Sequence, residues 1–174
     1  MTETSYRFWI HLSNGFLADG DVLTATVEGT ITNVGETVNE VKSYVVKRGD
    51  KDVTKNYTFG ESIPGKLEIT KRDVTITSGS PKRAYNGQPL TNSEITVTGT
   101  GFVTGEAPTS YDVTGTITNV GEVDNTFTYQ LPEGVNADNY DINLVKGKLE
   151  ITPVTAKIQI TADSDSKVYD ELLL

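Results

Sequence analysis

The chain has 174 residues, no cysteine, one histidine and a formal net charge of −9 at pH 7. Without cysteine it can form neither a disulfide nor a thiolate metal site, and its acidity argues against nucleic acid as a partner. Its 26 threonines, 18 valines and 16 glycines favour strands and turns, because β-branched side chains lose rotamer freedom in helices.

The N-terminal residues 1–12 do not have a basic region followed by an apolar run, and no stretch of 18 apolar residues occurs. The sequence therefore predicts neither a secretory signal nor a membrane-inserted helix within these residues. If the parent protein is exported, we expect its signal and its anchor to lie outside this sequence.

An internal repeat organises the chain. The octapeptide at residues 29–36 recurs letter for letter at 115–122, and the hexapeptide at 65–70 recurs at 147–152. An Asn-Tyr pair lies between these anchors, as Asn56-Tyr57 in the first copy and as Asn139-Tyr140 in the second. Three anchors in the same order indicate tandem copies of one module of about 80 residues.

A third copy begins near the C-terminus, where residues 158–170 resemble residues 74–86. We therefore predict three segments. Residues 1–70 form an incomplete first repeat that lacks its opening strand, residues 71–152 form a complete repeat, and residues 153–174 start a third, truncated repeat.

Apolar residues in the complete copy alternate with polar ones. The alternating sets are Phe127, Tyr129 and Leu131, then Tyr140, Ile142 and Leu144, then Leu149 and Ile151. This period of two predicts strands with one buried face, and turn residues separate the runs. We expect an all-β fold of small antiparallel β-sandwich (Ig-like) modules with little or no helix. A β-grasp-like module, with a helix across its sheet, is the alternative.

The junction between copies changes the parity of the apolar positions. Leu67 and Ile69 are odd-numbered, whereas Val74 and Ile76 are even-numbered. A strand that continued in register would keep its parity, so the chain should change sheet or domain at residues 70–73. The connector contains neither glycine nor serine, and we expect it to restrict bending between modules.

Catalytic residues are not evident. His11 has no counterpart in the second copy, and scattered acidic residues are expected to be solvated. We predict that the chain is not an enzyme and that it needs no cofactor or metal. Residues 163–166 (Asp-Ser-Asp-Ser) lack the remaining ligands of a calcium loop. An isopeptide bond between Lys66 or Lys148 and a neighbouring asparagine is disfavoured, because alternation places both lysines outward.

The repeated Tyr57 and Tyr140 are the weak candidates for ligand binding. Exposed tyrosine rings can stack on sugars, although tyrosines at strand ends more often have a packing role. The sequence alone leaves both interpretations open.

The order of short motifs resembles a known family. Arg83-Ala84-Tyr85-Asn86-Gly87 is followed by Asn-Val-Gly at 119–121, Asn-Tyr at 139–140 and Gly-Lys-Leu-Glu-Ile-Thr at 147–152. This order is similar to that of the YDG-type and MBG-type tandem repeats of bacterial cell-surface, adhesin-like proteins. The resemblance implies extracellular display at the cell surface and tandem β modules. It supplies no functional residues to carry over.

We therefore expect a non-catalytic extracellular module that acts as a stalk or spacer and contacts neighbouring repeats of its parent chain. The alternative is an adhesin repeat that binds host glycan, mucin or matrix protein. The truncated third copy raises one further hypothesis, namely that it supplies the strand that another chain's first copy lacks.

Overall fold

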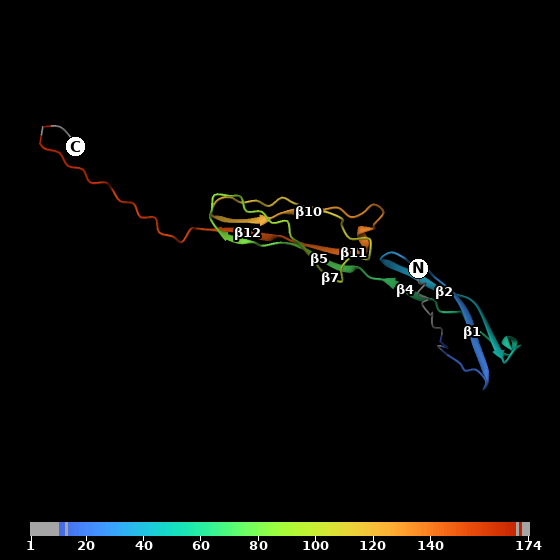
Figure 1. Ribbon diagram of the computed structural model, residues 1–174. Helices are drawn as coiled ribbons and strands as arrows, with labels where there is room; N and C mark the ends of the chain where they lie inside the picture. The colour runs from blue at the N-terminus through green and yellow to red at the C-terminus, as the bar shows by residue number, and fades with distance from the viewer. Residues whose placement is uncertain (1–10, 13, 170, 172–174) are drawn as a thin grey trace. The chain divides into compact units, whose positions relative to one another are not determined.

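The computed structural model describes residues 11–12, 14–169 and 171. Across these residues the chain is almost entirely β-structure, as the alternation predicted, and its only helical turns are two 3₁₀ segments (Figure 1). The elements in chain order are β1 (Asp21–Glu28), β2 (Gly35–Arg48), β3 (Lys51–Asp52), η1 (Thr54–Asn56), β4 (Gly65–Ile69), β5 (Arg72–Ser78), β6 (Lys82–Ala84), β7 (Ile95–Gly99), β8 (Tyr111–Val113), β9 (Gly121–Asn125), β10 (Phe127–Tyr129), η2 (Ala137–Asn139), β11 (Tyr140–Val145) and β12 (Gly147–Thr152).

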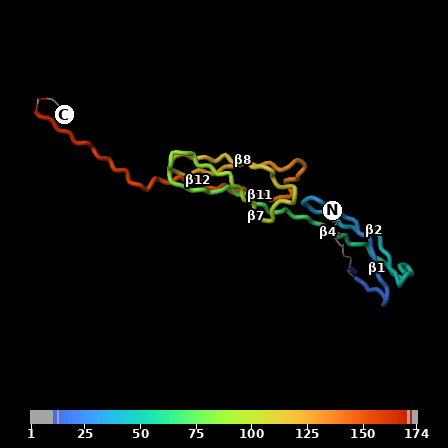
Figure 2. The backbone as a smooth tube through the Cα atoms, in the orientation of Figure 1, coloured from blue at the N-terminus to red at the C-terminus, as the bar shows by residue number. Residues whose placement is uncertain are grey.

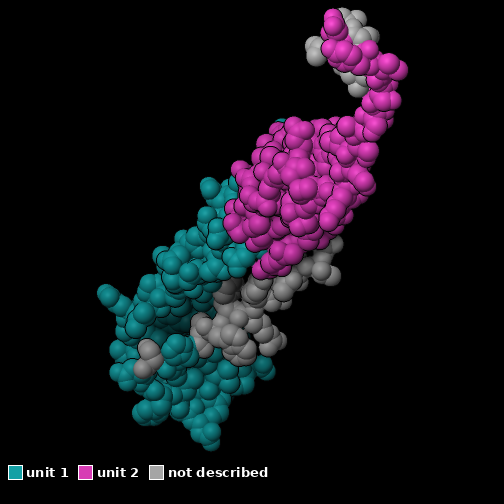
Figure 3. Space-filling model, turned by 90° about the vertical axis from the view of Figure 1, so that its left-hand side faces the viewer, with its two compact units in different colours: residues 1–73, 133–141 teal, residues 74–132, 142–174 magenta. Residues whose placement is uncertain are grey.

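The chain divides into two compact units (Figure 3). Unit 1 comprises residues 1–73 and 133–141, and unit 2 comprises residues 74–132 and 142–174. The first boundary lies close to the junction between the first two copies. Residues 133–141, by contrast, come from the second copy and group with unit 1. The helices of the described residues are too short to cross a membrane.

Unit 1 is built on a long antiparallel hairpin. The β1 strand pairs with β2 from Asp21 opposite Arg48 to Glu28 opposite Glu40, and its residues alternate between half-buried and exposed. The first five residues of β2 pair with β4, from Gly35 opposite Ile69 to Asn39 opposite Gly65. Threonine and valine fill these strands because their branched side chains suit a pleated, half-buried surface.

Unit 2 contains the better-buried core. The β12 strand lies between β9, which runs antiparallel to it, and β6, which runs parallel to it. Its side chains Leu149 and Ile151 are fully buried and form a cluster with Leu90 and the partly buried Ile117. Burial of such apolar side chains contributes most of the stabilisation of a small module.

A second sheet of three strands has β5 between β11 and β7, and a short pair joins β10 to β8. The change of parity correctly predicted a change of sheet, because β4 pairs with β2 whereas β5 pairs with β7. Only Thr70 and Lys71 separate β4 from β5.

Residues 153–169 extend away from β12 (Figure 2). No strand pairing occurs among the described residues of this segment, 153–169. Its apolar side chains are almost fully exposed, including Ile158 and Ile160 at 90% and 89%. The segment that resembles β5 and β6 in sequence therefore has no sheet to join in this structure.

Candidate functional site

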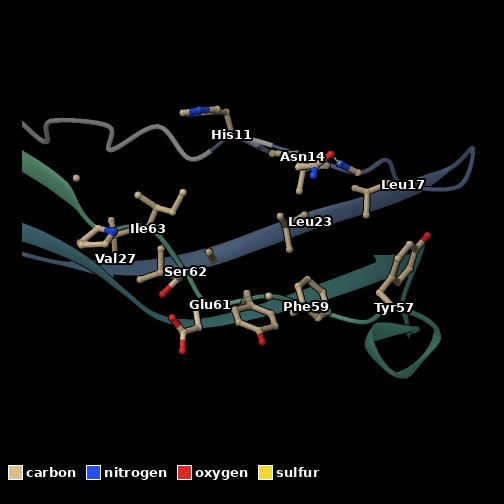
Figure 4. Close-up of a pocket in the computed structure, with 18 of the residues that line it drawn as sticks. His11, Asn14, Leu17, Leu23, Val27, Tyr57, Phe59, Glu61, Ser62 and Ile63 are labelled. Carbon is tan, nitrogen blue, oxygen red and sulfur yellow. Dashed lines mark hydrogen bonds between the residues drawn. The ribbon is translucent and has the colours of Figure 1, made fainter.

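A groove of about 450 Å³ opens on unit 1 (Figure 4). One wall is the face of β1 that carries Leu23 and Val27, which alternation places on the same side of the strand. Further lining comes from segment 57–65, including Phe59 and Ile63, and from residues 11–12 and 14–17. The lining is mostly apolar, so the groove can accept an apolar side chain or an extended peptide segment.

One end of the groove contains a polar cluster around Tyr57. The Tyr57 hydroxyl donates to Asp21 Oδ2 at 2.5 Å and accepts from the Ala18 amide at 3.0 Å. The other carboxylate oxygen of Asp21 accepts from Arg48 Nε at 2.6 Å. The Tyr57 ring also lies near Phe59, with a centroid distance of 6.5 Å. Tyr57 therefore ties segment 57–65 to the β1–β2 hairpin.

The cluster should make the stability of unit 1 depend on pH. Hydrogen bonds from Arg48 and then from Tyr57 lower the pKa of Asp21 below its ordinary value, while Asp21 raises the pKa of Tyr57. A lowered carboxyl pKa stabilises the fold above the unfolded-state pKa, and this stabilisation is lost as pH falls through the folded-state pKa.

We therefore expect the melting temperature of unit 1 to fall below about pH 4. An Asp21→Asn variant should start from a lower melting temperature at pH 7 and should lose less on acidification. Circular-dichroism melts between pH 7 and pH 2 measure both effects. Asp50→Asn, in the turn between β2 and β3, serves as the control. Identical acid profiles for the wild type and Asp21→Asn would contradict the assignment.

Tyr140, the second tyrosine candidate, begins β11 and is only 3% exposed. A ring this deeply buried offers no face on which a sugar could stack, and its position is that of a packing residue. Tyr57 is half-buried beside an open groove. Ligand binding at the two rings stays a prediction, and Tyr57 is the more accessible of the two.

The described residues show no arrangement suited to a metal site or to an isopeptide bond at Lys66. They contain no group of three or more metal-ligating side chains, and Asp165 accepts a hydrogen bond from the Ser166 amide. Lys66 points outward to Glu36 and Glu68 at 2.7 and 2.8 Å. These contacts raise the pKa of Lys66, which keeps the amine protonated and therefore non-nucleophilic.

Sequence reasoning missed the groove and two residues at its rim, Asn39 and Gly65. Neither belongs to a recognisable site motif. The repeat could have revealed them, because Asn39 and Gly65 occupy the positions of Asn125 and Gly147 in the second copy, which have the same strand register. Comparison with protein-family models, curated proteins and solved structures found no match for this chain.

Proposed function

We propose that the chain is a non-catalytic spacer made of tandem β modules, displayed on a bacterial surface as in the YDG-type and MBG-type repeats that its motifs resemble. In this proposal each module is a small antiparallel sandwich. Successive modules hold a more distal part of the parent protein away from the cell.

The observation that carries this proposal is the two-residue connector between β4 and β5. A connector of Thr70 and Lys71, without glycine, leaves little slack between one module and the next.

Small-angle scattering on a chain with three intact copies tests the spacer. If each module adds roughly 30–40 Å, the radius of gyration should be about 30 Å. A compact globule of the same length, about 245 residues, would give roughly 18 Å. A value near the lower figure would contradict the proposal.

Glycan binding, the alternative function, gains no support from the repeated tyrosines. A platform shared by all copies would need both rings exposed, whereas Tyr140 is buried. A glycan array probed with the intact chain would detect binding at the unit 1 groove. A weaker signal with Tyr57→Phe would assign that binding to Tyr57.

A further inference from the structure

In the complete copy, the opening strand β5 is held at its end by Asn125 of β9 and Gly147 of β12, here called the receiving residues. The inward-facing residues of β5 are Val74, Ile76 and Ser78, and all three are buried. At the end of the strand, Ser78 Oγ donates to the Asn125 carbonyl at 2.6 Å and accepts from the Gly147 amide at 2.9 Å. The following strand, β6, then pairs in parallel with β12.

Two further details fix this arrangement. Asn125 Nδ2 donates to the Gly79 carbonyl at 3.0 Å, which holds the chain as it leaves β5. A Cβ on Gly147 would lie 2.3 Å from the carbonyl oxygens of Ser78 and Gly79. Position 147 must therefore be glycine, because another strand crosses directly over it.

Unit 1 carries the same receiving residues, and no strand among its described residues occupies the place that β5 has in the complete copy. Asn39 and Gly65 have the register of Asn125 and Gly147, and β4 pairs with β2 alone among the described strands. Asn39 Oδ1 and Asn125 Oδ1 are both buried without a hydrogen-bond partner in the described part of the chain, so the two asparagines have the same local setting. Both residues border the apolar groove.

Gly65 has no local reason to be glycine. Its φ lies outside the left-handed region, and a Cβ there would meet only Asn39, at an ordinary 3.7 Å. The absence of a side chain makes physical sense if a strand crosses Gly65 as the end of β5 crosses Gly147.

The C-terminal segment resembles β5 and β6 in sequence, and these strands have no counterpart among the described residues of unit 1. Ile158 and Ile160 align with Val74 and Ile76, and Val168 aligns with Ala84 of β6. All three C-terminal side chains are about 90% exposed, a costly state for apolar side chains in an extended segment. The segment has 16 residues from Val154 to Tyr169, approaching the 20–30 per partner of a standard interface.

We propose that residues 154–169 of one copy of this chain insert into the unit 1 groove of a second copy. Ile158 and Ile160 enter the apolar groove, the Asp163 carbonyl accepts from the Asn39 amide, and Val168 pairs beside Thr70 as Ala84 pairs beside Thr152. This is strand addition of the kind used in donor-strand complementation.

The contact is head-to-tail, so each copy offers both a donor and an acceptor, and assembly propagates into longer oligomers. Because every copy carries a net charge of −9, salt should strengthen the association by screening repulsion. The proposal is independent of the spacer function.

One difference between the copies predicts how association can be improved. Ala162 stands at the position of Ser78, so the inserted segment lacks the hydroxyl that bonds the Asn125 carbonyl and the Gly147 amide. An Ala162→Ser variant restores both bonds to Asn39 and Gly65. We expect its dissociation constant to be about tenfold lower than that of the wild type.

Sedimentation velocity over a concentration series tests the proposal on the whole chain. The wild type should show oligomers that grow with concentration, Ala162→Ser should associate more tightly, and Gly65→Val should weaken association at least about a hundredfold. Thr26→Val is the control, because Thr26 lies on the exposed face of β1 and does not line the groove. Thermal melts of Gly65→Val confirm that unit 1 still folds.

Cysteine cross-linking tests the register, since the chain has no cysteine of its own. Thr70→Cys and Val168→Cys are placed in separate chains, mixed and oxidised. The expected product is a heterodimer joined by a disulfide, because directly paired strand residues lie within disulfide distance. A concentration-independent monomer, an absent heterodimer, or association unaffected by Gly65→Val would each overturn the proposal.

Discussion

Replacing Gly147 with alanine should destabilise unit 2 by about 3 kcal/mol. The added Cβ would lie 2.3 Å from two carbonyl oxygens, those of Ser78 and Gly79. These are backbone atoms, so they cannot rotate aside as a flexible side chain could. Either β5 must move away from β12, or the hydrogen bond from the Gly147 amide to Ser78 must break. Urea unfolding followed by circular dichroism measures the loss.

The first copy provides a matched control. Gly65 occupies the same position in its hexapeptide, but the nearest atom to its Cβ would be Asn39 Cβ at 3.7 Å. At low protein concentration, Gly65→Ala should change stability by no more than about 0.5 kcal/mol. Equal losses of stability for Gly65→Ala and Gly147→Ala would contradict the close approach of β5 to Gly147.

Truncating Leu149 to alanine should cost unit 2 about 2–5 kcal/mol. The side chain is fully buried against Leu90, Ile151 and Ile117, so its removal leaves a cavity as well as losing buried apolar surface. Hydrogen exchange can locate the effect. Amides of β9 and β12 should exchange faster, whereas amides of the β1–β2 hairpin should keep their protection.

The equivalent residue of the first copy, Leu67, is only half-buried. Leu67→Ala should therefore cost less than half as much as Leu149→Ala, because the cost of truncation grows with the buried surface and the cavity that remains. A loss below about 1 kcal/mol for Leu149→Ala would contradict a core centred on β12.

Local patterns in the sequence predicted the strands and the all-β class. Leu149 and Ile151 alternate with polar residues, and the structure buries both in β12. The change of parity between Ile69 and Val74 predicted that the chain leaves one sheet for another, and β4 and β5 do belong to different sheets. Both features follow from the period of two that strand geometry imposes.

Burial along a strand and pairing between distant strands could not be predicted in this way. Tyr140 and Leu144 share one face of β11, yet Tyr140 is buried and Leu144 is 47% exposed. The Asn86-Gly87 pair is typical of a hairpin, but β6 before it pairs with β12 and not with the next strand, β7. Alternation gives the face of a strand, whereas its neighbours depend on long-range packing.

The groove of unit 1 escaped prediction for a related reason. Asn39 and Gly65 show their role only beside Asn125 and Gly147, whose contacts with β5 depend on the folded backbone. The sequence around Asn39 and Gly65 alone does not indicate that another strand crosses these two residues.

The parallel pairing of β6 with β12 has a mechanical consequence. When a pulling force draws the start of β6 and the end of β12 apart, the two strands must slide past each other along their length. The facing pairs from Glu150–Lys82 to Thr152–Ala84 then bear the load together. An antiparallel hairpin pulled at its open end peels apart one pair at a time. The complete copy should therefore resist stretching better than the β1–β2 hairpin of the first copy.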